Sequence, residues 1–542
     1  MCLPNLRTIA APILLILFLS TWIVWRQSWN TGGRPGLDSP SGEATRRVAG
    51  AGRPEAGDEI NSPGRAPDLA GQAERFCGGC HAMPPFDSHP KAAWRKEVLQ
   101  GYEFYEESGR SDLVAPEQEE LVSLFESRAP DRLLFPDLSD DGSRLWSFQP
   151  RHERLSGLSE LPALAHLNMI SLDGDQTPWL VYCDMQSGEI GALAAGGEDR
   201  DGETRVLANL INPCHVEPCD LDNDGVLDLV VADLGSFVPA DHDRGRVVWL
   251  RRESGARSQW KTTVLLRGLG RVADVEPIDF DCDGDLDLLV AEFGWRKTGR
   301  IVLLEQRAPA EGVPQFEPHV LDRRHGTIHV PVADLNDDGR PDFVALISQE
   351  HEVIEAFLNE GAGGFRREVI YEARNPAFGS SGIQLVDLDG DGDLDVLYTN
   401  GDAMDGYVIK PYHGVQWLEN KGAYPFEYHH LAVMPGAARA LAGDLDGDGR
   451  LDVAAVAFLP DHVVETCPDQ KLDSILVMQQ GESKQFRRRP VERSNLQHMS
   501  LALVDVDGDG LLDLVTGNFA GAPERKGPRL TVWRNLGGNR QN

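Results

Sequence analysis

The stretch that decides the fold is Asp387-Leu388-Asp389-Gly390-Asp391-Gly392-Asp393-Leu394-Asp395. It carries carboxylates at positions 1, 3, 5 and 9 and glycine at position 6, and an apolar run follows it. Five other stretches repeat this pattern, with carboxylate or amide side chains at the same positions. The copies stand roughly 55 residues apart, which indicates a repeated structural unit. The five begin at Asp220, Asp279, Asp334, Asp444 and Asp505.

The pattern is that of a loop that binds a hard cation. Oxygens at positions 1, 3 and 5 converge only if the backbone turns sharply, which glycine at position 6 allows, and a carbonyl near position 7 with the carboxylate at position 9 completes a shell for Ca²⁺. The alternative is a set of acidic surface turns without metal. We expect about six Ca²⁺ ions, with these ligands: Asp220, Asp222, Asp224 and Asp228; Asp279, Asp281, Asp283 and Asp287; Asp334, Asn336, Asp338 and Asp342; Asp387, Asp389, Asp391 and Asp395; Asp444, Asp446, Asp448 and Asp452; Asp505, Asp507, Asp509 and Asp513.

The residues after each loop distinguish between calcium architectures. An EF-hand needs glutamate at position 12 and flanking helices. Position 12 instead lies inside β-type runs such as Leu229-Val230-Val231-Ala232, so the EF-hand is excluded. The phrase ahead of a strand resembles the FG-GAP/VCBS repeat, which is the blade unit of integrin-α-type β-propellers. The resemblance covers residues 144–536 and implies a mainly β fold.

Seven blades are expected in a propeller domain at 144–542. Each unit reads as four strands with the acidic loop after the first, as in a propeller blade. An upstream unit at 171–179 has lost several ligand positions, so we expect it to keep the blade without the metal. The last unit ends after its third strand, and residues 144–155 resemble the missing fourth strand. The N-terminal end of the domain should therefore close the ring and remove exposed edges.

The N-terminal region indicates export. Residues 9–25 carry no charge and lie between Arg7 and Arg26, with three tryptophans nearby. This pattern favours an uncleaved signal-anchor at 1–29 that spans the cytoplasmic membrane; the alternative is a removed export signal. Residues 30–67 are rich in Gly, Pro and Ser and read as a disordered linker. We therefore expect a membrane-anchored protein whose globular part lies in the periplasm or at the cell surface.

The sequence Cys77-Gly78-Gly79-Cys80-His81 is the attachment signature of c-type haem. A helical lead-in to Cys77 and a later helix at 116–128, with Pro116 at its first turn, resemble the terminal helices of a small cytochrome c. We expect one covalent haem c in a domain at 68–135, held by Cys77, Cys80 and His81. The alternatives are a redox Cys-x-x-Cys and half of a zinc site. The sixth iron ligand is open among Met83, His89 and none.

One further set of residues shares a place in the repeat. The residue five before each loop start should face one end of the central channel of a propeller. These residues are a candidate polar ring for a ligand or a metal, and the alternative is polar strand ends hydrated in the channel. They are His215, Asp274, His329, Gly382, Arg439 and Ser500.

Charge and motifs bound the function. The formal net charge of −34 argues against a nucleic-acid partner, because phosphate binding needs a basic face. Nothing resembles a nucleophile elbow or a zincin helix, so no hydrolase is expected. The leading hypothesis is an exported, membrane-tethered, calcium-stabilised propeller whose haem domain transfers electrons and whose surface docks a ligand or protein. The alternatives are a non-redox adhesion scaffold and a haem-linked oxidoreductase with its substrate in the channel.

Overall fold

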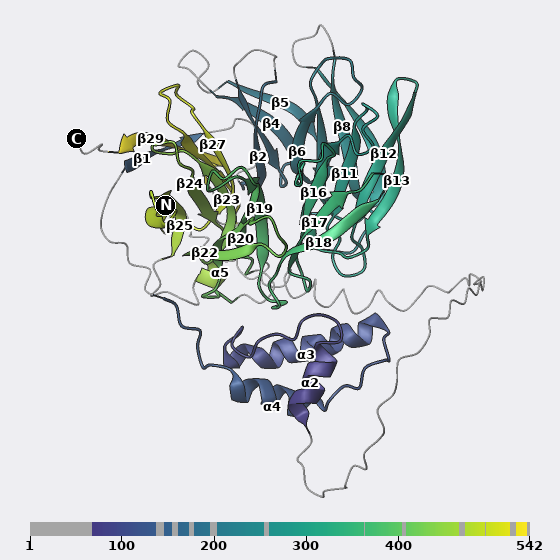
Figure 1. Cartoon of the computed structure of the whole chain (residues 1–542), viewed down its shortest axis with the longest axis vertical. Helices are drawn as coiled ribbons and strands as arrows, with labels where there is room; N and C mark the ends of the chain where they lie inside the picture. Colours follow the sequence, from purple (N-terminus) through teal and green to yellow (C-terminus); the bar gives the residue numbers. More distant parts are fainter. Residues whose placement is uncertain are drawn as a thin grey trace, which may run out of the picture. The chain divides into compact units, whose positions relative to one another are not determined.

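The computed structural model describes residues 68–136, 146–153, 161–172, 178–195, 203–253, 259–361, 364–403, 408–464, 472–493, 495–520 and 527–538. The expected signal-anchor at 1–29 and linker at 30–67 lie outside these residues. Within the described ranges, no helix has both the length and the apolar character needed to cross a membrane. The described chain forms three helices followed by seven antiparallel sheets (Figure 1). The prediction of a mainly β, seven-bladed propeller is confirmed.

Each blade is an antiparallel sheet whose strands take equivalent places in the repeat. The first strands are β2 (Leu164–Ile170), β6 (Pro213–Cys219), β10 (Val272–Ile278), β14 (Thr327–His329), β19 (Ser380–Val386), β23 (Ala437–Gly443) and β27 (His498–Val504). The second strands are β3 (Trp179–Asp184), β7 (Asp228–Asp233), β11 (Asp287–Glu292), β16 (Asp342–Ile347), β20 (Asp395–Asn400), β24 (Asp452–Ala457) and β28 (Asp513–Asn518).

The outer strands complete the blades. The third strands are β4 (Glu189–Ala194), β8 (Gly245–Arg252), β12 (Arg300–Ala310), β17 (Val353–Asn359), β21 (Gly414–Glu419), β25 (Asp473–Gln480) and β29 (Leu530–Gly538). The fourth strands are β5 (Thr204–Asn209), β9 (Trp260–Leu269), β13 (Val313–Asp322), β18 (Phe365–Glu372), β22 (Glu427–Val433), β26 (Phe486–Arg493) and β1 (Trp146–Glu153). A two-residue strand, β15 (Val332–Ala333), also pairs with β16, and a short helix, α5 (Asp461–Val464), follows β24.

The seventh blade joins the two ends of the propeller sequence. Its strand order is β1-β29-β28-β27, and β1 pairs antiparallel with β29, with Pro150 opposite Trp533. The first strands of neighbouring blades contact one another in a complete circle from β2 round to β27. Strand β1, Trp146–Glu153, thus supplies the fourth strand of the last blade and lies within the stretch 144–155 expected to close the ring.

The core lies between the blades. Every residue of the second strands is buried, as expected for strands covered on both faces. Their aliphatic side chains belong to seven apolar clusters, each shared by two adjacent blades. Each blade is therefore stabilised mainly by its two neighbours, which is the energetic reason for a closed ring.

All seven first strands are irregular at the same point. The register with the second strand shifts just before the residue that stands five before the loop, for example between Pro213 and His215 and between Val272 and Asp274. A β-bulge inserts an extra residue and re-aims the side chains beside it. This bulge therefore sets the direction of the ring of side chains described below.

The helical segment has its own small core. Its helices are α2 (Leu69–Cys77), α3 (Lys91–Ser108) and α4 (Gln118–Arg128). Asp68 caps α2 by accepting a hydrogen bond from Gly71 N at 3.2 Å, and the buried rings of Phe76, Trp94 and Phe125 belong to one cluster. The helix before Cys77 occurs as expected. Pro116 lies before the cap of α4 rather than in its first turn, and α3 was not predicted.

Candidate functional site

The six acidic loops share one backbone conformation. Glycine at position 6 has φ between 79° and 101° in all of them, in the left-handed region that glycine adopts without steric cost. Position 4 is left-handed as well, and there the residue is glycine in only three loops. Cys282 occupies it with φ 60°, where its Cβ costs energy that glycine would not.

Backbone amides hold the carboxylate at position 1. Asp387 accepts hydrogen bonds from Asp391 N at 3.1 Å and from Gly392 N at 3.0 Å. The same pair of bonds, from positions 5 and 6, recurs in the loops that begin at Asp220, Asp334, Asp444 and Asp505. Position 5 in turn accepts from position 7, as when Asp391 binds Asp393 N at 3.0 Å. The carboxylates at positions 1, 3 and 5 are thus fixed around one turn.

The aspartate at position 9 has a structural task that the sequence did not reveal. It is buried in all six blades and accepts a hydrogen bond of 2.6–2.9 Å from a backbone amide in the third strand or directly after it. In five blades it also accepts from the amide at position 2. Burial raises the pKa of Asp228 to about 6 and that of Asp452 to about 7. A carboxylate has about four lone-pair sites, so position 9 keeps capacity for a cation.

The loops are also tied to the neighbouring blade. The carbonyl of Leu445, at position 2 of one loop, accepts a hydrogen bond from Asn535 Nδ2 of the next blade at 2.8 Å. Asn359 does the same to Phe280 O at 2.8 Å, and Gln480 to Leu388 O at 2.9 Å. Whatever orders a loop therefore also orders the contact between two blades.

The loops are suited to a cation. Asp222 Oδ1 is buried and has no hydrogen-bond partner among the described residues, and a buried lone oxygen of this kind normally has a partner. Basic side chains already contact several loop carboxylates, such as Arg251 with Asp222 and Asp224 and Lys484 with Asp389. Positions 1, 3 and 5 supply the hard oxygen ligands that Ca²⁺ takes. A bound Ca²⁺ ion would compete with these basic side chains.

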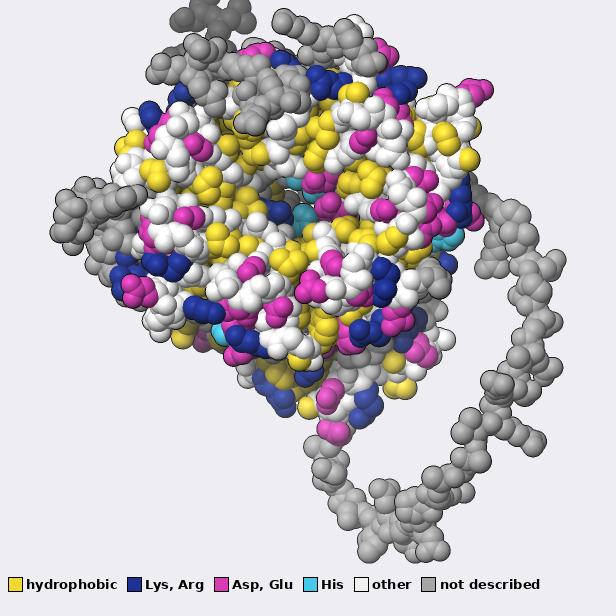
Figure 2. Space-filling view, turned by 45° about the horizontal axis from the view of Figure 1, so that its top comes forward, with side chains coloured by type: hydrophobic (Ala, Val, Ile, Leu, Met, Phe, Trp, Pro, Cys, Tyr) yellow, Lys and Arg dark blue, Asp and Glu magenta, His cyan; other side chains and the backbone are white. Residues whose placement is uncertain are grey.

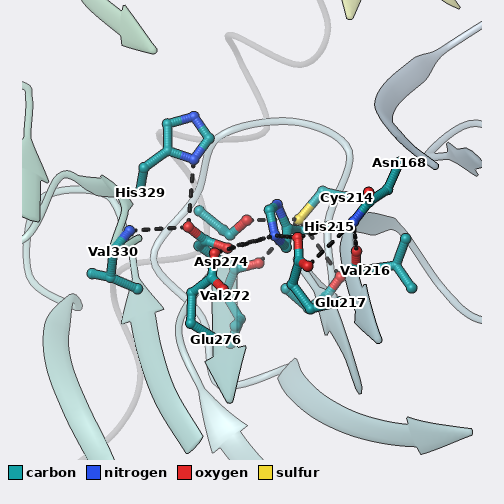
Figure 3. A network of polar contacts seen from close by, with 12 residues as sticks. Asn168, Cys214, His215, Val216, Glu217, Val272, Asp274, Glu276, His329 and Val330 are labelled. Carbon is teal, nitrogen blue, oxygen red and sulfur yellow. Dashed lines mark hydrogen bonds and ion pairs between the residues drawn. The ribbon is translucent and has the colours of Figure 1, made fainter. Parts of the chain in front are cut away.

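Four of the six residues predicted to form a polar ring come together in the central channel (Figure 3). His215 Nε2 lies 2.9 Å from both Asp274 Oδ1 and Glu217 Oε1. Asp274 Oδ2 lies 3.4 Å from His329 Nδ1 and accepts from Val330 N at 3.0 Å. Arg439 Nη1 stands 3.3 Å from His329 Nε2. The other two ring residues take no part in this network: Gly382 has no side chain, and Ser500 donates to Leu164 O.

Electrostatics couple these groups. Burial alone would lower the pKa of His215, but Asp274 and Glu217 outweigh it and raise that pKa. Burial would raise the pKa of Asp274, but His215 holds it well below its usual range. Burial, together with Asp274, raises the pKa of Glu276. Figure 2 looks onto a hollow in the middle of the propeller where histidine, acidic and basic side chains are visible. The cluster is therefore charged and crowded, with His215 and Asp274 buried and Glu217 and His329 partly exposed.

The sequence reasoning missed His166 and the two glutamates. The rings of His166 and His215 are 4.1 Å apart between centroids, and His166 Nε2 is buried with no hydrogen-bond partner in the described chain. His166 stands five before the degenerate loop that begins at Ser171, so the same offset would have found it. Glu217 and Glu276 stand three before their loops, on the same face of the strand because side chains alternate.

The Cys-x-x-Cys-His motif follows directly on the end of α2. The Cys77 thiol is half-buried against the helical core, and burial raises its pKa to about 11. Cys80 is exposed, and Arg110 Nη1 lies 3.0 Å from its sulfur. Cys77 is thus the last residue of α2, and Cys80 lies three residues beyond it.

The histidines of the helical segment are suited to bind a metal. His81 Nδ1 lies 2.7 Å from Ala82 O, an arrangement that orients the ring and leaves Nε2 as a ligand atom. His89 is buried, its Nδ1 lies 3.1 Å from Ser88 Oγ, and burial lowers its pKa to about 3. His89 is therefore a neutral imidazole, the form that ligates iron. Met83 packs against the same core.

The profile of the FG-GAP-like repeat matches residues 220–290 and 319–398. Among solved structures, the chain is similar to the N-terminal domain of Nup159, with 12% identity and a TM-score of 0.40 over 73% of this chain and 97% of that one. It is also similar to the exotype rhamnogalacturonan lyase YesX, with 13% identity and a TM-score of 0.38 over 68% and 72%. No curated protein matches. The chain contains FG-GAP-like repeats within a seven-bladed β-propeller.

Proposed function

We propose that the protein works outside the cytoplasm as a calcium-stabilised docking propeller whose helical segment carries one covalent haem c for electron transfer. The observation that supports this most is the Cys77-x-x-Cys80-His81 motif at the end of α2, with the His81 ring oriented by Ala82 O. When bound, haem supplies a reversible one-electron couple. In this proposal the segment at 1–29 tethers the protein to the cytoplasmic membrane.

Different residues of the helical segment would attach the haem, ligate its iron and support the motif. Cys77 and Cys80 hold the group covalently, and His81 Nε2 is the proximal ligand. The packed rings of Phe76, Tyr102 and Trp94 fix α2 and α3, so the motif is presented on a rigid support. His89 and Met83 are the side chains from which a sixth ligand would come.

The propeller would serve as the docking surface. About six Ca²⁺ ions in the acidic loops would brace contacts between neighbouring blades, because the loop carbonyls are bonded across those contacts, as Leu445 O is to Asn535. The central hollow (Figure 2) gives a concave place for a ligand. The partner in this proposal is a redox protein or an extracellular ligand, and no nucleic acid is involved.

The test is to express the full chain with cytochrome c maturation machinery and to examine the purified protein. We expect one covalent haem per chain by mass spectrometry and by the pyridine haemochrome spectrum. Cys77→Ser with Cys80→Ser should carry none, whereas Cys282→Ser, at an exposed cysteine in a propeller loop, should carry a full equivalent. His81→Ala should keep the thioethers and change the spectrum.

The possible results separate the rival functions. Haem-free protein after maturation would overturn the electron-transfer proposal and favour the non-redox adhesion scaffold. Covalent haem whose reduction by small donors falls when Arg439 or His329 is replaced would favour the oxidoreductase with its substrate in the channel. Covalent haem that reduces equally well in those variants supports the function proposed here.

A further inference from the structure

One nitrogen atom in the channel, His215 Nε2, lies close to more carboxyl groups than it can donate hydrogen bonds to. His215 Nε2 has carboxylate oxygens of Asp274 and Glu217 at 2.9 Å and of Glu276 at 3.8 Å. An imidazole nitrogen carries at most one hydrogen. A single N–H therefore cannot satisfy all three carboxyl groups.

Two buried atoms near this nitrogen make no hydrogen bond among the described residues. Asp274 Oδ1 is close to His215 Nε2 but is not aligned with it as a hydrogen-bond acceptor, and it makes no other hydrogen bond among the described residues. His166 Nε2 is likewise unpartnered in that part of the chain. Buried polar atoms are normally satisfied. Two such atoms close to His215 therefore point to a ligand at this cluster.

The spacing matches a first coordination shell. Bonds of 2.0–2.1 Å in a tetrahedral site put neighbouring ligand atoms about 3.4 Å apart. Asp274 Oδ1 lies 2.9 Å from His215 Nε2, and Asp274 Oδ2 lies 3.4 Å from His329 Nδ1. One ligand atom from each of these three residues lies within 4.8 Å of the others. The two distances that involve Asp274 are therefore close to those of such a shell.

The acidic groups of the cluster also favour a cation. Glu217, Asp274 and Glu276 bring three carboxyl groups, and His215 and Arg439 are the basic groups beside them. A divalent ion bound by the two imidazoles would take the place of the His215 proton between these carboxyl groups. The position is also reachable, because the side chains of Glu217 and His329 are 21% and 19% exposed.

We propose that the central channel binds one divalent transition-metal ion through His215, Asp274 and His329. Two imidazoles and one carboxylate form the donor set that takes Zn²⁺ and similar borderline metals. The all-oxygen loops on the same propeller suit Ca²⁺ instead, so the two kinds of site differ in chemistry. Three protein ligands leave one position of a tetrahedral shell open, and the His166 ring, 4.1 Å from the His215 ring between centroids, is a further donor nearby.

The test is a metal titration of the full chain in millimolar Ca²⁺, which occupies the loops. Zn²⁺ is followed by calorimetry, and Co²⁺ by its visible ligand-field absorption. The Cys77→Ser, Cys80→Ser protein is titrated in parallel, because those thiols bind the same metals with distinct sulfur charge-transfer bands. We expect one equivalent that persists in the double cysteine variant and binds at micromolar concentration or tighter.

Substitutions in the channel then identify the ligands. His215→Gln, which keeps the size and an amide donor, and His329→Ala should each weaken binding by about 100-fold or more. The matched control is His430→Ala, at an exposed strand position outside the channel, which should leave the affinity unchanged. Circular dichroism and urea midpoints confirm folding, and His329→Ala serves alone if His215→Gln does not fold. Absence of binding below about 100 µM, or binding kept by the folded variants, overturns the proposal.

Discussion

Replacing Asp391 with asparagine should lower the free energy of unfolding in the presence of calcium. Without calcium it should leave that free energy unchanged or raise it slightly. Asp391 is position 5 of the loop that begins at Asp387, and its Oδ1 accepts a hydrogen bond from Asp393 N at 3.0 Å. Asparagine keeps that acceptor and removes one negative charge. The substitution therefore isolates the role of the carboxylate as a ligand from its role in shaping the turn.

The magnitude follows from mass action. A site of the extracellular type binds Ca²⁺ with a dissociation constant near 10⁻⁴ M, and at 1 mM Ca²⁺ it adds about 1.4 kcal/mol to the free energy of unfolding. Asp391→Asn should lose about that amount in calcium. In chelator it should lose nothing or gain slightly, because the charges of Asp387 and Asp389 repel one another less. Full chelation of six such loops should cost the native protein about 8 kcal/mol.

The assay is urea denaturation of native protein and variant, each in 1 mM Ca²⁺ and in EDTA. The control is Asp243→Asn, which removes a charge at an exposed position of the propeller outside the acidic loops and should behave alike in both buffers. Equal destabilisation of Asp391→Asn with and without calcium would mean that the carboxylate only shapes the turn. An unchanged midpoint for native protein after exhaustive chelation would refute calcium binding by the loops.

Three further substitutions test other parts of the propeller. Asn535→Ala removes the Nδ2 bonds to Leu445 O and Leu512 O and leaves buried carbonyls unpaired, so urea unfolding should show a loss of about 3 kcal/mol; a loss below 1 kcal/mol would contradict this. Cys282→Gly relieves the left-handed strain at φ 60° and should raise the free energy of unfolding by about 1 kcal/mol, whereas a decrease would show that the cysteine is preferred there. Burial raises the pKa of Glu352 to about 7 from 4.5, so its contribution to stability is complete below pH 4.5 and is lost as pH rises to 7. Glu352→Gln has no carboxyl group at this position and lacks this loss. Between pH 4.5 and 7 the free energy of unfolding of the native protein should therefore fall by about 3 kcal/mol relative to that of the variant; parallel curves of unfolding free energy against pH would refute the shift.

The repeat made most of the fold predictable. A single nine-residue phrase placed six loops, and the apolar run behind each one placed a buried second strand. The degenerate copy at Ser171 and the unit that lacks a fourth strand completed the count of seven blades. The helix α3 was missed because its buried residues, Trp94, Val98 and Tyr102, are few and are separated by charged positions.

The site was less predictable than the fold because it depends on contacts between blades. A strand offset placed His215, Asp274 and His329 on one ring, but only the curvature of the closed propeller shows which ring members touch. Ser500 shares the offset and bonds to Leu164 O instead. The hydrogen bonds that Asp228 and its equivalents accept could not be predicted either, since the donors lie on the third strand, far from the loop in the sequence.

The construction of the last blade constrains how the protein is made. Strand β1 is synthesised first and β29 last, yet each is the other's partner. The ring therefore stays open until the ribosome has synthesised β29, and an early stop that deletes β29 leaves unpaired edges on both β1 and β28. Such edges template aggregation, so premature truncation should yield insoluble protein rather than a smaller working molecule.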